Sequence, residues 1–88
     1  MMKTQKIVRN RQGLRARPAA LIATRARHFK SMISIGNGLR MVDAKSVLEV
    51  MLLGAPCGAT VTISAEGEDE SLAIETLCGL FDESFGER

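Results

Sequence analysis

The stretch Gly13-Leu14-Arg15-Ala16-Arg17-Pro18-Ala19-Ala20 marks the passage from an extended segment into a helix. Glycine readily ends extended structure, and proline fits the first turn of a helix, where its missing N–H group costs nothing. The start of a helix presents unpaired N–H groups and the positive end of the helix dipole. With Arg15 and Arg17 beside it, this helix start is predicted to bind a phosphate or a carboxylate. Two solvated arginines at a helix start are the alternative interpretation.

Composition is typical of one small globular domain covering residues 1–88, with 45% hydrophobic and 25% charged residues. No apolar run is long enough to cross a bilayer, and the N-terminus lacks a secretory apolar region, so we expect a cytoplasmic protein with no membrane partner. One histidine and two isolated cysteines predict no metal site, and no motif predicts a cofactor. Cys57 and Cys78 are expected to be reduced and to act as small hydrophobic fillers.

Charge is divided unevenly along the chain. Residues 1–45 contain eleven Lys or Arg and one acid, which gives +10, whereas residues 46–88 contain nine acids and one Arg, which gives −8. This separation favours a basic face that attracts acidic partners, unless the fold interleaves the two halves. Nucleic acid is a disfavoured partner, because three Phe and no Tyr or Trp offer no platform on which bases could stack.

Hydrophobic periodicity and turn residues predict the order β-α-β-β-α-β-α. The Ser46-Val47-Leu48-Glu49 sequence has the form of a capping box, which opens the middle helix. This order is typical of an α+β two-layer open-faced β-sandwich, a four-stranded antiparallel sheet with three helices on one face. The expected elements are strand 3–9, a helix from residue 18, strand 32–35, a turn at 36–38, strand 39–42, helix 46–54, strand 60–65, and a final helix that starts after residue 67 and fades before 86.

Two apolar stripes should form much of the core. They have the spacing of one helical face, with charged residues beside them. Their members are Ala19, Ile22, Ala23, Ala26 and Phe29 in the first helix, and Ala73, Ile74, Leu77, Cys78 and Phe81 in the last.

The chain resembles the HPr family, the histidine-containing phosphocarriers of the bacterial sugar phosphotransferase system. The resemblance covers nearly the whole length and is carried by several motifs in order. These are the G-L-x-A-R-P-A-A stretch, the Asn-Gly hairpin, Asp43-Ala44-Lys45-Ser46, the helix end from Met51 to Gly54, and the stretch from Ile63 to Glu70. The resemblance implies the same open-faced sandwich that the periodicity predicts.

In that family a histidine stands between Gly-Leu and Ala-Arg-Pro, takes a phosphoryl group from Enzyme I and passes it to IIA domains. Here the position is Arg15. A neutral imidazole nitrogen is a nucleophile near neutral pH, whereas a guanidinium with a pKa of about 12.5 or higher has no free lone pair. Arg15 and Arg17 can therefore hold a phosphate, but Arg15 cannot carry one covalently. His28 lies roughly 15 Å along the helix and is expected to be a helix-end surface residue rather than a substitute carrier.

The resemblance also implies a regulatory site at Ser46, the position that HPr kinase/phosphorylase modifies in many members. A phosphate at a helix N-cap meets the favourable end of the dipole, so modification should leave the fold intact. A plain capping serine is the alternative. The family's partner-binding patch corresponds to Leu14, Ala20, Val47, Leu48 and Met51, for which ordinary core packing is the alternative. The middle helix is too short to bury all its apolar residues, so some should face solvent or a partner.

These features predict a non-catalytic regulatory protein similar to the Crh branch of the family, which also lacks the acceptor histidine and keeps the regulatory serine. The implied partners are HPr kinase/phosphorylase, Enzyme I or IIA domains, or a transcriptional regulator. A working phosphocarrier is the alternative, if Arg15 replaces a native histidine or another residue accepts the phosphoryl group.

Overall fold

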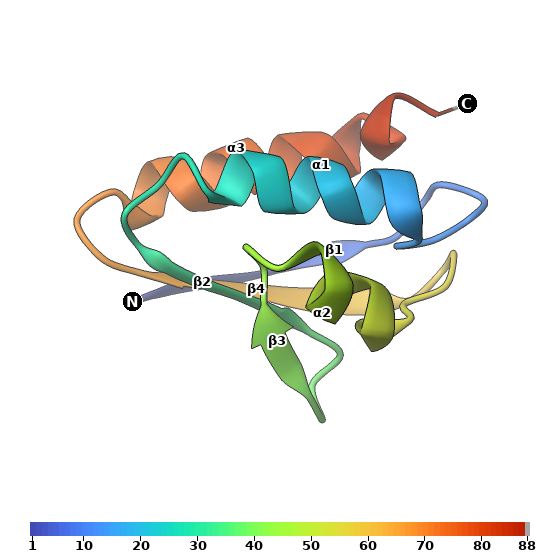
Figure 1. Ribbon diagram of the computed structural model, residues 1–88, viewed down its shortest axis with the longest axis horizontal. Coiled ribbons are helices and arrows are strands. Elements are labelled where there is room, and N and C mark those ends of the chain that lie inside the picture. The colour runs from blue at the N-terminus through green and yellow to red at the C-terminus, as the bar shows by residue number, and fades with distance from the viewer. Residues whose placement is uncertain (88) are drawn as a thin grey trace.

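The computed structural model describes residues 1–87, in which a β-sheet and helices pack together (Figure 1). Its four strands form a single antiparallel sheet in the order β1-β4-β2-β3. The predicted four-stranded antiparallel sheet with three helices is confirmed. The elements are β1 (Met2–Ile7), α1 (Ala16–Ala26), β2 (Met32–Gly36), β3 (Met41–Asp43), α2 (Val47–Leu53), β4 (Thr60–Glu66), α3 (Glu70–Asp82) and a short 3-10 helix, η1 (Ser84–Gly86).

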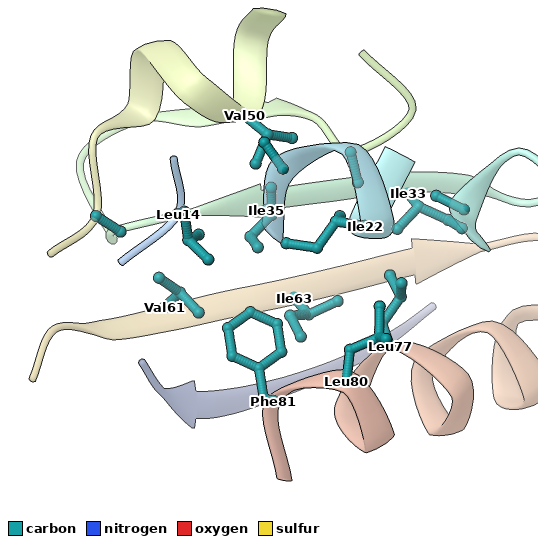
Figure 2. Packing of buried hydrophobic residues seen from close by; sticks show 14 of the residues in the cluster. Leu14, Ile22, Ile33, Ile35, Val50, Val61, Ile63, Leu77, Leu80 and Phe81 are labelled. Carbon is teal, nitrogen blue, oxygen red and sulfur yellow. The ribbon is translucent and has the colours of Figure 1, made fainter. Parts of the chain in front are cut away.

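The core lies between one face of the sheet and the helices. Alternation along β4 buries Val61 and Ile63, because successive strand side chains point to opposite faces. Figure 2 shows Ile22 of α1, Val50 of α2 and Leu77 of α3 directed at the sheet. α1 and α3 lie side by side above the sheet, and α2 packs against α1 and beside β3. All three helices therefore cover the same face, and the opposite face remains open.

The first helix and the hairpin differ in detail from the sequence-based expectations. α1 begins at Ala16 rather than Pro18, since the Ala19 N–H donates to the Arg15 carbonyl at 2.8 Å and closes a turn earlier. The hairpin forms, but its return strand starts at Met41 rather than Leu39. The Asn37 side-chain oxygen accepts the N–H groups of Leu39 and Arg40, which extends the turn over residues 37–40.

The C-terminal part also departs from the predicted stripe. Leu80 occupies the core, whereas Cys78 is half-buried against it, and burial raises the pKa of the Cys78 thiol. After α3 the chain makes η1, which was not predicted. Phe85 is buried there with φ of 56° and packs edge-on against Phe81, with ring centroids 4.9 Å apart. Over residues 1–87, no helix combines the length and hydropathy that a membrane-spanning segment needs.

Candidate functional site

The loop before α1 is held in place by its own turn and by the segment after α2. The Asn10 side-chain amide donates to the Gly13 carbonyl at 2.7 Å, and the Gly13 N–H donates back to the Asn10 carbonyl at 3.1 Å. The Leu14 N–H then donates to the Ala55 carbonyl at 2.9 Å. Asn10 and Leu14 are both buried, so the loop is packed into the fold rather than lying free on its surface.

This loop presents Arg15 and Arg17 at the start of α1. Arg15 is the N-cap residue in extended conformation, and its side chain makes no capping bond. Among residues 1–87, no backbone or side-chain acceptor meets the N–H groups of Ala16 and Arg17, and Pro18 has none to satisfy. Both arginines are exposed. The predicted combination of free N–H groups and guanidinium groups is therefore present.

Arg15 and Arg17 line two neighbouring depressions of the surface. Arg15 lines one of about 430 Å³, together with Met51 of α2 and the segment 54–57. Arg17 lines another of about 480 Å³, beside Gly86 and Glu87. Arg11 and Gln12 line both. Arg11 thus belongs to the candidate anion site, and sequence reasoning missed it because only its charge, not a motif, marks it.

Charge pairing leaves this site basic. Within the described part of the chain, the ion pairs are the N-terminal amine with Glu70, at 3.3 Å, and Lys6 with Asp82. The basic and acidic halves of the sequence therefore interleave where β1 meets α3. The arginines at the start of α1 are not neutralised in this way, so the site keeps its attraction for anions.

Ser46 is the N-cap residue of α2, as the capping box predicts. Its Oγ accepts the Glu49 N–H at 3.2 Å. The reciprocal bond of a capping box is not made, because the Glu49 carboxylate instead accepts the Asp43 N–H at 3.3 Å. Ser46 is partly exposed, and its hydroxyl hydrogen is not required for the cap.

The predicted partner-binding residues divide by exposure. Leu48 is 65% exposed and Met51 is also exposed, whereas Val47 and Ala20 are half-buried. Leu14 differs from the expectation that it lies in an exposed partner-binding patch. Its side chain is only 1% exposed, because the bond to Ala55 draws the loop inward. Leu52, which is not among the predicted partner-binding residues, is 59% exposed on the same short helix. α2 thus leaves several apolar side chains in solvent, as its length predicts.

The remaining chemistry-bearing residues lie apart from one another. His28 is exposed beyond the end of α1, at the opposite end of that helix from Arg15. Both cysteines are free, but Cys57 is exposed in the turn after α2 and is not the hydrophobic filler expected. Residues 1–87 contain no cluster of three or more His, Cys, Asp or Glu side chains suited to a metal ion.

Known proteins match both the sequence and this geometry. A family described as the PTS HPr component phosphorylation site matches residues 2–83. The chain belongs to the HPr family. The phosphocarrier protein HPr of Cupriavidus necator is 38% identical over 87 residues, which are 99% of this chain and 98% of that protein. The HPr-like protein Crh of Bacillus subtilis is 41% identical over 83 residues, 93% and 98% of the two chains.

Solved structures of HPr proteins agree with the fold. HPr-C-His from Thermoanaerobacter tengcongensis shares 41% identity, with a TM-score of 0.96 and coverage of 100% of this chain and 99% of that one. The catabolite repression protein Crh of Bacillus subtilis shares 38% identity, with a TM-score of 0.75 and coverage of 96% and 97%. The chain is thus a homologue of phosphocarrier HPr proteins and of the HPr-like protein Crh.

Proposed function

We propose that this HPr-family protein is a regulatory member that does not carry phosphohistidine and acts through phosphorylation of Ser46 and docking to other proteins. The observation that carries the proposal is the residue at the N-cap of α1. Arg15 stands where the family's motif has its acceptor histidine, and the free N–H groups around it are those that would support a transferred phosphoryl group. These N–H groups are present at the start of α1, whereas the side chain at position 15 is not a nucleophile.

The chemistry of the alternative acceptors favours this proposal. A guanidinium remains protonated at any physiological pH and has no lone pair with which to attack phosphorus. His28 has the right chemistry but the wrong place, since the eleven residues of α1 separate it from the anion site. It also lacks the helix N–H groups that would stabilise the phosphoryl group there.

The neighbourhood of Ser46 supports the regulatory part. The hydroxyl sits at the start of α2, and the exposed Leu48 and Met51 lie on the helix that follows. HPr kinase/phosphorylase would modify Ser46, and a phosphate there would change the charge of this apolar surface without breaking the fold. Enzyme I, IIA domains or a transcriptional regulator would then bind it with altered affinity.

Intact mass after two separate incubations tests the proposal. HPr kinase with ATP is expected to add one acid-stable phosphoryl group, which Ser46→Ala abolishes. Enzyme I with phosphoenolpyruvate is expected to add none. An acid-labile adduct in the second incubation would establish the working phosphocarrier instead, and no adduct in the first would remove the regulatory role.

Three arginines that form no ion pair within residues 1–87 favour a second candidate, a competitive decoy. Arg11, Arg15 and Arg17 line adjoining depressions at a helix N-terminus, which suits them to hold the phosphate of a phosphorylated partner without accepting it. Excess protein should then slow phosphoryl transfer from Enzyme I through a true HPr, and Arg15→Gln with Arg17→Gln should relieve the inhibition. Undiminished transfer at large excess would refute this function.

A further inference from the structure

The end of α1 and the start of α2 are joined by two reciprocal hydrogen bonds. Arg27 Nε donates to the Lys45 carbonyl at 2.8 Å, and Lys45 Nζ donates to the Phe29 carbonyl at 2.8 Å. The Lys45 N–H also donates to Asp43 Oδ1 at 2.9 Å. The Lys45 carbonyl belongs to the peptide bond that leads into Ser46. The Arg27 guanidinium is therefore fixed beside the backbone of the candidate phosphorylation site.

Most of the hydrogen-bonding capacity of Arg27 is unused. A guanidinium carries five N–H donors in a planar fork, and only Nε is engaged here. Within residues 1–87, no carboxylate lies within ion-pair distance of it. The residue is exposed, so its terminal nitrogens can reach an anion without displacing another part of the fold.

A phosphate at this place would need such a cation. Phosphorylation adds nearly two negative charges, and the cap brings the carboxylates of Asp43 and Glu49 close to Ser46. Lys45 is the other cation of the junction, but its ammonium is held at the Phe29 carbonyl. Arg27 is the group placed both to balance the charge and to make a two-pronged contact.

We propose that Arg27 is the internal ligand of a phosphate on Ser46. Its Nε stays on the Lys45 carbonyl while its terminal nitrogens bind the phosphate oxygens, so the modified α1–α2 junction is more tightly joined than the unmodified one. This inference rests on the proposed function, in which Ser46 is the modified residue. It adds a residue from a different helix that stabilises the modified state.

The test installs phosphoserine at position 46 of the full chain during synthesis, so it does not depend on any kinase. Phosphorus NMR then follows the second ionisation of the phosphate with pH. Arg27→Gln keeps a donor for the Lys45 carbonyl but removes the charge, and should raise the pKa of the phosphate by about 0.3 to 0.7 of a unit.

Arg27→Lys should recover part of the shift. Arg25→Gln, a matched exposed residue in the last turn of α1, should leave it nearly unchanged. Equal shifts for Arg25→Gln and Arg27→Gln would overturn the assignment, because they would show only a general loss of positive charge.

Thermal unfolding gives a second readout that a purely structural role would not move. The change in melting temperature on phosphorylation should be more favourable for the wild-type protein than for Arg27→Gln, whereas an identical change in both would overturn the inference. Failure of HPr kinase to modify the wild-type protein would refute the proposed function alone, since the installed phosphoserine tests Arg27 separately.

Discussion

The N–H group of Leu14 donates to the carbonyl oxygen of Ala55 at 2.9 Å, and this bond joins the loop that carries Arg15 to the segment that follows α2. Gly13 lies against the same carbonyl group. The two candidate sites are therefore connected through the backbone: Arg15 begins α1 just after this contact, and Ser46 begins the helix that leads into it. The contact is close enough that position 13 has no room for a side chain.

Replacing Gly13 with Ala should destabilise the protein by about 1–3 kcal/mol. Gly13 has φ of 71°, and a Cβ there would stand 2.5 Å from the Ala55 oxygen. Gly58→Ala is the matched control, because Gly58 has φ of 93° but open space around its Cβ position. Urea denaturation should show a clearly smaller loss for Gly58→Ala. Equal losses would mean that backbone strain alone, not the contact with Ala55, requires glycine at position 13.

Stability should fall in acid because of Asp69. Hydrogen bonds from the Ser31 hydroxyl, the Lys30 N–H and the Ser31 N–H hold the pKa of the Asp69 carboxyl at about 2, below its ordinary value of 3.8. The unfolded chain therefore binds more protons in this range, so the stabilisation is complete above pH 3.8 and is lost as the pH falls to about 2. Urea unfolding between neutral pH and about pH 2 measures this loss. Glu70 adds a dependence of the same sign, because the Gly67 N–H lowers the pKa of its carboxyl.

The variant Asp69→Asn isolates this effect. It should be less stable than the wild type at neutral pH, and the difference should shrink as the pH falls toward about 2. Glu68→Gln is the control, since among the described residues the Glu68 carboxylate has no hydrogen bond or ion pair. A constant difference between Asp69→Asn and the wild type at every pH would contradict the assignment.

The cap of α2 should be measurable apart from any modification of Ser46. Ser46→Ala removes the acceptor of the Glu49 N–H and should cost about 1 kcal/mol. Ser46→Asp restores a side-chain acceptor and should lie within a few tenths of a kcal/mol of the wild type. Thermal or urea unfolding of the three proteins checks this order. If alanine and serine proved equally stable, the short helix would not depend on its cap, and Ser46 would have no measurable structural role.

Local signals predicted the elements of this fold well, whereas burial that depends on contacts distant in sequence was not predicted. The cap at Ser46 was predictable, because the bond to Glu49 spans three residues. The turn from Gly36 to Gly38 likewise marked the hairpin, although the Asn37 side chain lengthened it. The burial of Leu14 was not predictable, since it depends on Ala55, about forty residues away.

The residues of the candidate site also divide into those that adjacent sequence signals predict and those that only the folded chain brings together. Arg15 and Arg17 were found because a glycine, a proline and a helix start are adjacent in the sequence. Arg11 joins them only when the turn at Asn10 folds back, and Arg27 reaches the Lys45 carbonyl, next to Ser46, only because two helices pack together. No periodicity or motif encodes either relationship.

Arg15→His should restore acceptance of a phosphoryl group. The supporting groups are in place, since the N–H groups of Ala16 and Arg17 have no partner in the described chain and the neighbouring depressions stay basic. A neutral imidazole at the N-cap would supply the missing nucleophile. Intact mass after incubation with Enzyme I and phosphoenolpyruvate should show one acid-labile adduct on this variant and none on the wild type. The same adduct on Arg15→His combined with His28→Gln would place it at position 15. Its absence from Arg15→His would show that the surface for Enzyme I has diverged as well, so that loss of the nucleophile is only part of the difference from a carrier.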